Sequence, residues 1–147
     1  MINDLLLVTT VAGRSAAIRA AEVESVIEID AFVPIPLAPS PVIGLATLRS
    51  RVLTVIDVRA ALNLEPDSAA PQGRRAIVID CEGHSYALLV DAVLDVTPAL
   101  SELEPTRADT GDGWAAAGRG MVETVTGPLL VLDGATLARG VAFAEAA

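Results

Sequence analysis

The chain has 147 residues, 52% of them hydrophobic, and a formal net charge of −9 at pH 7, so it is long enough to bury the core of one domain. The acidic charge and the scarcity of aromatic residues argue against binding to a phosphate backbone or stacking on bases. All ten basic residues are arginine, which excludes chemistries that need a lysine, such as Schiff-base catalysis and the phosphate-loop lysine.

The N-terminal residues and the single cysteine favour the cytoplasm. The chain begins MINDLLLV, which lacks the positive segment of a secretory signal. No apolar run approaches the length of about eighteen residues that spans a bilayer. Cys81 has no second cysteine with which to form a disulfide, as is usual in a reducing compartment. We therefore expect a soluble cytoplasmic protein.

Short runs of β-branched and leucine residues, bounded by Gly, Pro, Asp and Ser, predict an all-β fold. The predicted strands lie at 5–11, 15–18, 26–33, 44–48, 52–56, 76–81, 85–90, 93–97, 120–124 and 129–132. Short helices are predicted at 19–22, 58–62 and 134–138, and polar or glycine-rich loops at 65–75 and 106–118. This spacing of strands is typical of a β-barrel or a β-sandwich.

Two weak internal matches predict a repeat. Residues 44–57 (GLATLRSRVLTVID) align with 120–133 (GMVETVTGPLLVLD) at an offset of 76, and residues 13–26 align with 83–96 at an offset of 70. Because both matches follow the same order, we expect two similar five-stranded lobes in a single domain spanning 1–147. The lobes are expected at about 15–75 and 76–140, with the N-terminal strand completing the barrel arrangement. Lobes of this size bury little surface alone, so they should share a hydrophobic seam.

The repeat explains why Arg49, Ser50 and Arg51 interrupt two apolar runs. The second copy has Val125-Thr126-Gly127 at these positions, which is typical of a tight connection between two strands. Arg49 is therefore predicted at the end of a hairpin. An exposed arginine at such a position can be an ordinary solvated turn residue.

The catalytic motifs in the chain are short and incomplete. GHSYA at 83–87 resembles a nucleophile elbow, but His84 is the only histidine and directly precedes Ser85, so no separate base remains. DTG at 109–111 resembles an aspartic protease motif, but its polar surroundings differ from the apolar loops of those enzymes. The neighbouring Asp80, Cys81, Glu82 and His84 would alternate across one strand and not converge on a metal ion. A small serine or aspartic hydrolase is a remote alternative, and we expect no enzyme activity, cofactor or metal.

Three segments together resemble the CheW family, the coupling proteins of bacterial chemotaxis. VIEI at 26–29 is similar to the family's V-x-E-I, and ALLVDAVLDV at 87–96 is similar to its G-L-x-V-D-x-V-x-x-V. PIPLAPSPVIGLATLRSRVLTVIDVRAAL at 34–62 resembles a longer and more specific family stretch that contains N-L-R-G. The likeness covers about 5–139. Thr47, Ser50 and Ala87 depart from the family pattern.

The resemblance implies an all-β fold of two intertwined five-stranded SH3-like β-barrels that share a hydrophobic seam, with a few short helices. It also implies a non-enzymatic adaptor that couples the regulatory domain of a CheA-type histidine kinase to the cytoplasmic tips of chemoreceptors, recruited to membrane-associated arrays without inserting into the membrane. A CheW-like module of another two-component or pilus-type pathway is the alternative. Carried over position by position, the implied partner-binding residues are Val26, Glu28, Gly44, Arg49, Ile77, Ala87, Val93 and Val96.

Two structural expectations follow for these residues. Glu28 and Arg49 are expected to form an ion pair across neighbouring strands, which would orient the arginine for a partner. An apolar groove between the lobes would suit a helical receptor tip. The residues expected to line this groove are Val26, Ile77, Val93 and Val96. Plain core packing is the alternative for each of them, because any strand buries alternating aliphatic residues.

Overall fold

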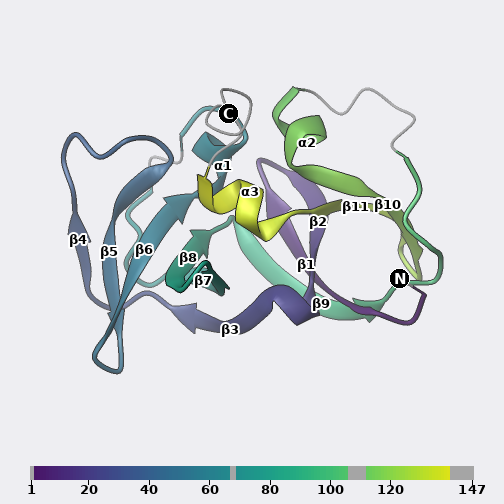
Figure 1. Cartoon of the computed structure of the whole chain (residues 1–147), viewed down its shortest axis with the longest axis horizontal. Coiled ribbons are helices and arrows are strands. Elements are labelled where there is room, and N and C mark those ends of the chain that lie inside the picture. Colours follow the sequence, from purple (N-terminus) through teal and green to yellow (C-terminus); the bar gives the residue numbers. More distant parts are fainter. Residues whose placement is uncertain (1, 67–68, 106–111, 140–147) are drawn as a thin grey trace.

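Strands in two sheets make up most of the molecule (Figure 1). A computed structural model describes residues 2–66, 69–105 and 112–139. The strands are β1 (Leu5–Val11), β2 (Arg14–Arg19), β3 (Val23–Glu28), β4 (Phe32–Pro34), β5 (Val42–Leu48), β6 (Arg51–Asp57), β7 (Arg75–Cys81), β8 (His84–Leu89), β9 (Ala92–Pro98), β10 (Gly118–Thr124) and β11 (Gly127–Leu132). The helices are η1 (Ala20–Glu22), α1 (Val58–Ala61), α2 (Asp112–Ala117) and α3 (Gly134–Arg139). The all-β prediction is confirmed.

Two local predictions are wrong. The predicted strand 26–33 is divided into β3 and β4, because the chain bends between them to leave β7 and pair with β5. At the bend, the backbone N–H of Ile29 donates to the carbonyl of Arg74 at 2.8 Å. The predicted loop 106–118 contains the helix α2 within its described part.

Each sheet curls into a barrel. Barrel 1 has the strand order β10-β11-β2-β1-β9, and barrel 2 has the order β3-β7-β8-β6-β5-β4. Barrel 2 closes because β4, which continues from β3, pairs with β5. Barrel 1 closes in the same way, since the chain after β9 pairs with β10 through Glu104 and Met121. Figure 1 shows the two barrels side by side, with α3 between them.

The two barrels are intertwined. The segment 15–75 supplies β2 to barrel 1 and β3 to β6 to barrel 2, whereas 76–140 supplies most of β7 and all of β8 to barrel 2 and the last three strands to barrel 1. Each half of the chain therefore contributes strands to both barrels.

The strand register confirms the internal repeat residue by residue. In barrel 2, β6 runs parallel to β8 with Val55 opposite Ala87, and in barrel 1, β11 runs parallel to β2 with Val131 opposite Ala17. Val55 corresponds to Val131 at the offset of 76, and Ala17 corresponds to Ala87 at the offset of 70. The same offsets relate antiparallel pairs of the two barrels: Val26–Ile77 to Val96–Leu7, and Leu48–Arg51 to Thr124–Gly127.

The largest apolar cluster lies between the barrels. It contains eighteen buried residues, against eight inside barrel 2 and six inside barrel 1, so the shared cluster is larger than the core of either barrel. Successive side chains of a strand point to opposite faces, and β7 therefore sends Val78 into barrel 2 and Ile77 into the cluster between barrels. Trp114 of α2 also packs there, and Arg14 lies over its ring at 4.4 Å. This cluster is the predicted hydrophobic seam.

Gly44 lies on β5 where β4 approaches most closely. A Cβ atom at this position would lie 2.6 Å from the Phe32 ring and would collide with the carbonyl of Val33. We expect Gly44→Ala to push β4 away from β5 and to lower the free energy of unfolding by about 1–3 kcal/mol. Urea unfolding followed by circular dichroism measures this loss, and an unchanged unfolding midpoint would contradict it.

Candidate partner-binding surface

The β5–β6 hairpin ends in a two-residue turn formed by Arg49 and Ser50. Leu48 pairs with Arg51 at the base of the turn, and the two turn residues have φ angles of 50° and 73°. Positive φ at both central residues is what a type I′ turn requires, and Asn or Gly is usual there because a larger side chain disfavours it. Arg49 therefore lies exposed at the end of a hairpin, as predicted.

A hollow of about 370 Å³ separates this turn from β3. Val26 and Arg49, two of the predicted partner-binding residues, both line it. The other lining residues are Glu24, Ser25, Ile27, Leu48 and Arg51. Aliphatic and charged side chains are mixed around the hollow, as is usual at the border of a protein–protein interface.

The predicted ion pair between Glu28 and Arg49 is not present among the described residues. Glu28 lies at the end of β3 opposite Arg75, where it lines a separate hollow with Asp30. Glu28 and Arg49 are both exposed, so each remains accessible to a partner. The expectation failed because the residues of β3 that line the hollow beside the hairpin turn are Glu24 to Ile27, which precede Glu28.

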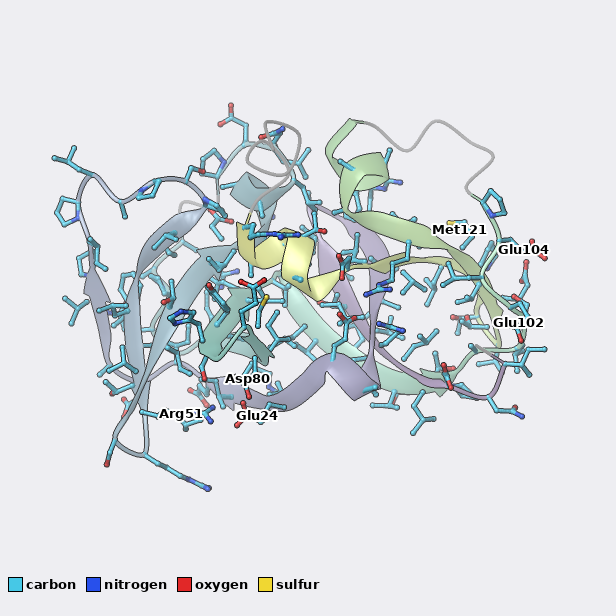
Figure 2. The ribbon with its side chains drawn as sticks, in the orientation of Figure 1. Glu24, Arg51, Asp80, Glu102, Glu104 and Met121 are labelled. Atoms are coloured by element: carbon cyan, nitrogen blue, oxygen red, sulfur yellow. The ribbon has the colours of Figure 1, made fainter. Side chains whose placement is uncertain are left out.

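Arg51 forms the ion pair that joins the hairpin to β3. Its Nη1 atom donates a hydrogen bond to Oε1 of Glu24 at 2.7 Å. This hydrogen bond raises the pKa of the Arg51 guanidinium above its ordinary value. Figure 2 shows Glu24 and Arg51 next to each other, with Asp80 close by on β7. Arg51, to which sequence analysis assigned no role, is thus a structural partner at the candidate site.

Val26 and Val96 occupy equivalent ends of two apolar rows. One row crosses barrel 2 and the other crosses barrel 1, and their inner members are buried in the seam. The rows are Val26-Ile77-Leu88-Ile56 and Val96-Leu7-Ile18-Leu132. Val26 is 38% exposed and Val96 is 49% exposed, because β3 and β9 are edge strands. Both valines are therefore available to a partner.

The other four predicted residues are buried or half-buried. Ile77 is fully buried in the seam, and Ala87 is fully buried inside barrel 2. Gly44 is buried beneath β4, and Val93 is half-buried against the seam. Ile77 therefore does not line an open groove.

The serine of GHSYA lies in a hairpin. Glu82 and Gly83 form the β7–β8 turn, with φ angles of 53° and 82°, and the Ser85 hydroxyl donates to Oδ1 of Asp80 at 2.8 Å. The DTG sequence at 109–111 lies outside the described residues. Within the described ranges, no group of three His, Cys, Asp or Glu side chains is placed to hold a metal ion.

Asp91 connects the two barrels on another side of the molecule. Its carboxylate accepts hydrogen bonds from Nε and Nη2 of Arg59, at 3.0 and 2.8 Å, and from the backbone N–H of Ala12 at 2.9 Å. Arg59 belongs to α1, which follows β6 of barrel 2, and Ala12 lies in the β1–β2 turn of barrel 1. The hydrogen bond from Arg59 lowers the pKa of Asp91, with a smaller contribution from its positive charge.

This ion pair should make stability depend on pH. Because the pKa of Asp91 is lower in the folded protein than in the unfolded chain, its ionisation stabilises the fold above the unfolded value of about 3.9. That contribution disappears as the pH falls through the folded pKa. We expect the free energy of unfolding to fall less steeply below about pH 5 in Asp91→Asn than in the wild type. Urea unfolding across pH values tests this, with Asp30→Asn as an exposed control. Parallel pH profiles for Asp91→Asn and the wild type would contradict it.

The chain is similar to a known protein family and to two curated proteins. A family model described as CheW-like domain matches residues 5–142. The chain is 33% identical over 91 residues to "Chemotaxis protein CheW" of Rhizobium meliloti (strain 1021), covering 60% of the chain and 57% of that protein. It is 34% identical over 93 residues to "Probable chemotaxis protein CheW" of Rhizobium etli, covering 60% and 59%. The matches thus span less than two thirds of the length of these curated relatives.

A solved structure with the same architecture is described as "Crystal structure of scaffolding protein TtCheW from Thermoanaerobacter tengcongensis". The TM-score is 0.75 at 22% sequence identity, over 93% of this chain and 88% of that one. At this identity the likeness establishes the fold.

Within the described part of the chain, no helix is long and apolar enough to cross a membrane.

Proposed function

Since this chain belongs to the family of CheW-like domains, we propose that it is a non-enzymatic scaffold in bacterial chemosensory signalling. It binds the regulatory domain of a CheA-type histidine kinase and the cytoplasmic tips of chemoreceptors, and it thereby couples one to the other in the cytoplasm. The observation that carries this proposal is the family match across 5–142, which takes in both barrels.

The geometry of the exposed residues supports a role in protein binding. Val26 and Val96 place aliphatic surface at equivalent edges of the two barrels, where a helical partner can bury it. Arg49 adds an exposed positive charge at the end of a hairpin. In the proposed complex, these residues and Glu28 contact partners directly, whereas Gly44, Ile77, Ala87 and Val93 maintain the supporting fold.

A binding experiment with purified components tests the proposal. The full chain is immobilised and offered, separately, a CheA-type regulatory domain and a helical hairpin that represents a chemoreceptor tip. We expect both to be retained, and failure to retain any CheA-type regulatory domain would overturn the proposal. Retention of the kinase domain without any chemoreceptor tip would contradict the coupling role and favour a CheW-like module of another two-component or pilus-type pathway.

A further inference from the structure

The edge strands β3 and β9 contain bulges at equivalent positions. In β3, Val23 and Ser25 lie opposite consecutive residues of β7, so Glu24 is the additional residue. In β9, Val93 and Asp95 lie opposite consecutive residues of β1, so Leu94 is the additional residue. The offset of 70 converts Glu24 into Leu94. A bulge redirects the side chain of its additional residue. Glu24 and Leu94 are therefore the residues to compare between the two barrels.

Each bulge borders a hollow beside a hairpin turn. In barrel 2, Glu24 lines the hollow next to the β5–β6 turn and holds Arg51 at 2.7 Å. In barrel 1, Leu94 lines a hollow of about 310 Å³ next to the β10–β11 turn, together with Val125. The offset of 76 converts Arg51 into Gly127, which has no side chain. The two hollows are therefore equivalent in the fold but differ in chemistry.

Barrel 1 shows which parts of the arrangement in barrel 2 the fold requires. Barrel 1 has the same bulge, the same hairpin and the same register without an ion pair between them. The pair of Glu24 and Arg51 is consequently not needed to form this architecture. A charged connection that one copy has and the other does not have is suited to a task specific to barrel 2.

We propose that the ion pair of Glu24 and Arg51 is a latch that ties the β5–β6 hairpin to β3 and positions Arg49 to bind a carboxylate of a partner protein. The inference rests on the proposed function, since the partners are those of a chemosensory scaffold. Glu24 and Arg51 are positioning residues in this arrangement, and Arg49 is the contact residue.

The surroundings of Arg51 show how much depends on Glu24. Nη2 of Arg51 is buried without a hydrogen-bond partner among the described residues, so the guanidinium is fixed mainly through its bond to Glu24. Asp80 contributes a further attractive charge from β7. Only the two-residue Arg49–Ser50 turn separates Leu48 from Arg51, so Arg49 lies two residues from the side chain that Glu24 holds.

Arg49 is suited to an acidic contact. It is exposed and makes no ion pair among the described residues, so its charge is available to a partner. Opposite charges brought together at the border of an interface accelerate association and select the partner more than they stabilise either protein.

Charge reversal and its repair distinguish a latch from a direct contact. The variants are Glu24→Arg, Arg51→Glu and the doubly reversed protein, with Glu123→Arg on barrel 1 as an exposed control that matches the charge change of Glu24→Arg. Binding of the CheA-type regulatory domain and of the receptor-tip hairpin is measured by titration calorimetry at two salt concentrations. We expect each single reversal to weaken binding of at least one partner by roughly tenfold, and the doubly reversed protein to recover most of it. The control should bind as the wild type does.

A second measurement needs no partner. Amide hydrogen exchange at residues 48–51 should accelerate in both single variants, return toward the wild-type rate in the double variant, and remain unchanged in β7 and β8. Unchanged exchange in the single variants would overturn the latch. A double variant that binds as weakly as the single variants would also overturn it, because Glu24 or Arg51 would then contact the partner directly. If the wild type binds neither probe, the proposed function fails, whereas the exchange rates still support or overturn the latch.

Discussion

Ile77→Ala is expected to lower the free energy of unfolding by about 2–5 kcal/mol, because Ile77 is fully buried in the seam between the barrels and its removal leaves a cavity. Val26→Ala changes the cross-strand neighbour of Ile77 in the same apolar row. This substitution should lower the free energy of unfolding much less, since Val26 is partly exposed on an edge strand. Urea unfolding of both variants provides the comparison. Equal losses would show that Val26 belongs to the core and is not available to a partner.

Arg49→Glu is expected to weaken binding of a kinase domain or receptor tip by at least about tenfold, while the melting temperature changes little. The side chain is exposed at the hairpin turn, so its contribution to folding is small. In a complex, however, the reversed charge would face a partner carboxylate at an interface. Titration calorimetry and thermal unfolding measure the two effects on the same samples.

Arg139→Glu is the control for that experiment, because Arg139 is exposed at the end of α3 and carries the same charge. It should bind normally. A protein in which Arg49→Glu lowers the melting temperature while leaving affinity unchanged would assign Arg49 a structural role instead of a recognition role.

The strand pattern and the repeat predicted most of the fold because both depend on local sequence. Runs of aliphatic residues between turn residues determine where strands form. The offsets of 70 and 76 then predicted which residues are equivalent, and the register of the parallel pairs agrees with both. The helix α2 could not be predicted in this way. It is short, and it is stabilised by Trp114 entering the seam, which is a contact between distant parts of the chain.

The candidate site was less predictable than the fold, for two physical reasons. Barrel strands next to the seam are buried on both faces, and alternation of polar and apolar residues therefore could not distinguish Ile77 and Ala87 from surface residues. A bulge inserts one residue and changes which side chains face the hairpin. Glu24 therefore pairs with Arg51, in place of the expected pair of Glu28 with Arg49.

The division of strands between the barrels has a consequence for synthesis on the ribosome. Barrel 2 is built from one continuous segment, β3 to β8, and its strands can pair as soon as β8 has emerged. The hairpin of β1 and β2 is translated before barrel 2, yet its other sheet partners, β9 and β11, are translated after barrel 2. The apolar faces of this hairpin must therefore remain without their final neighbours while barrel 2 is synthesised, which leaves the hairpin exposed to aggregation for longer than barrel 2.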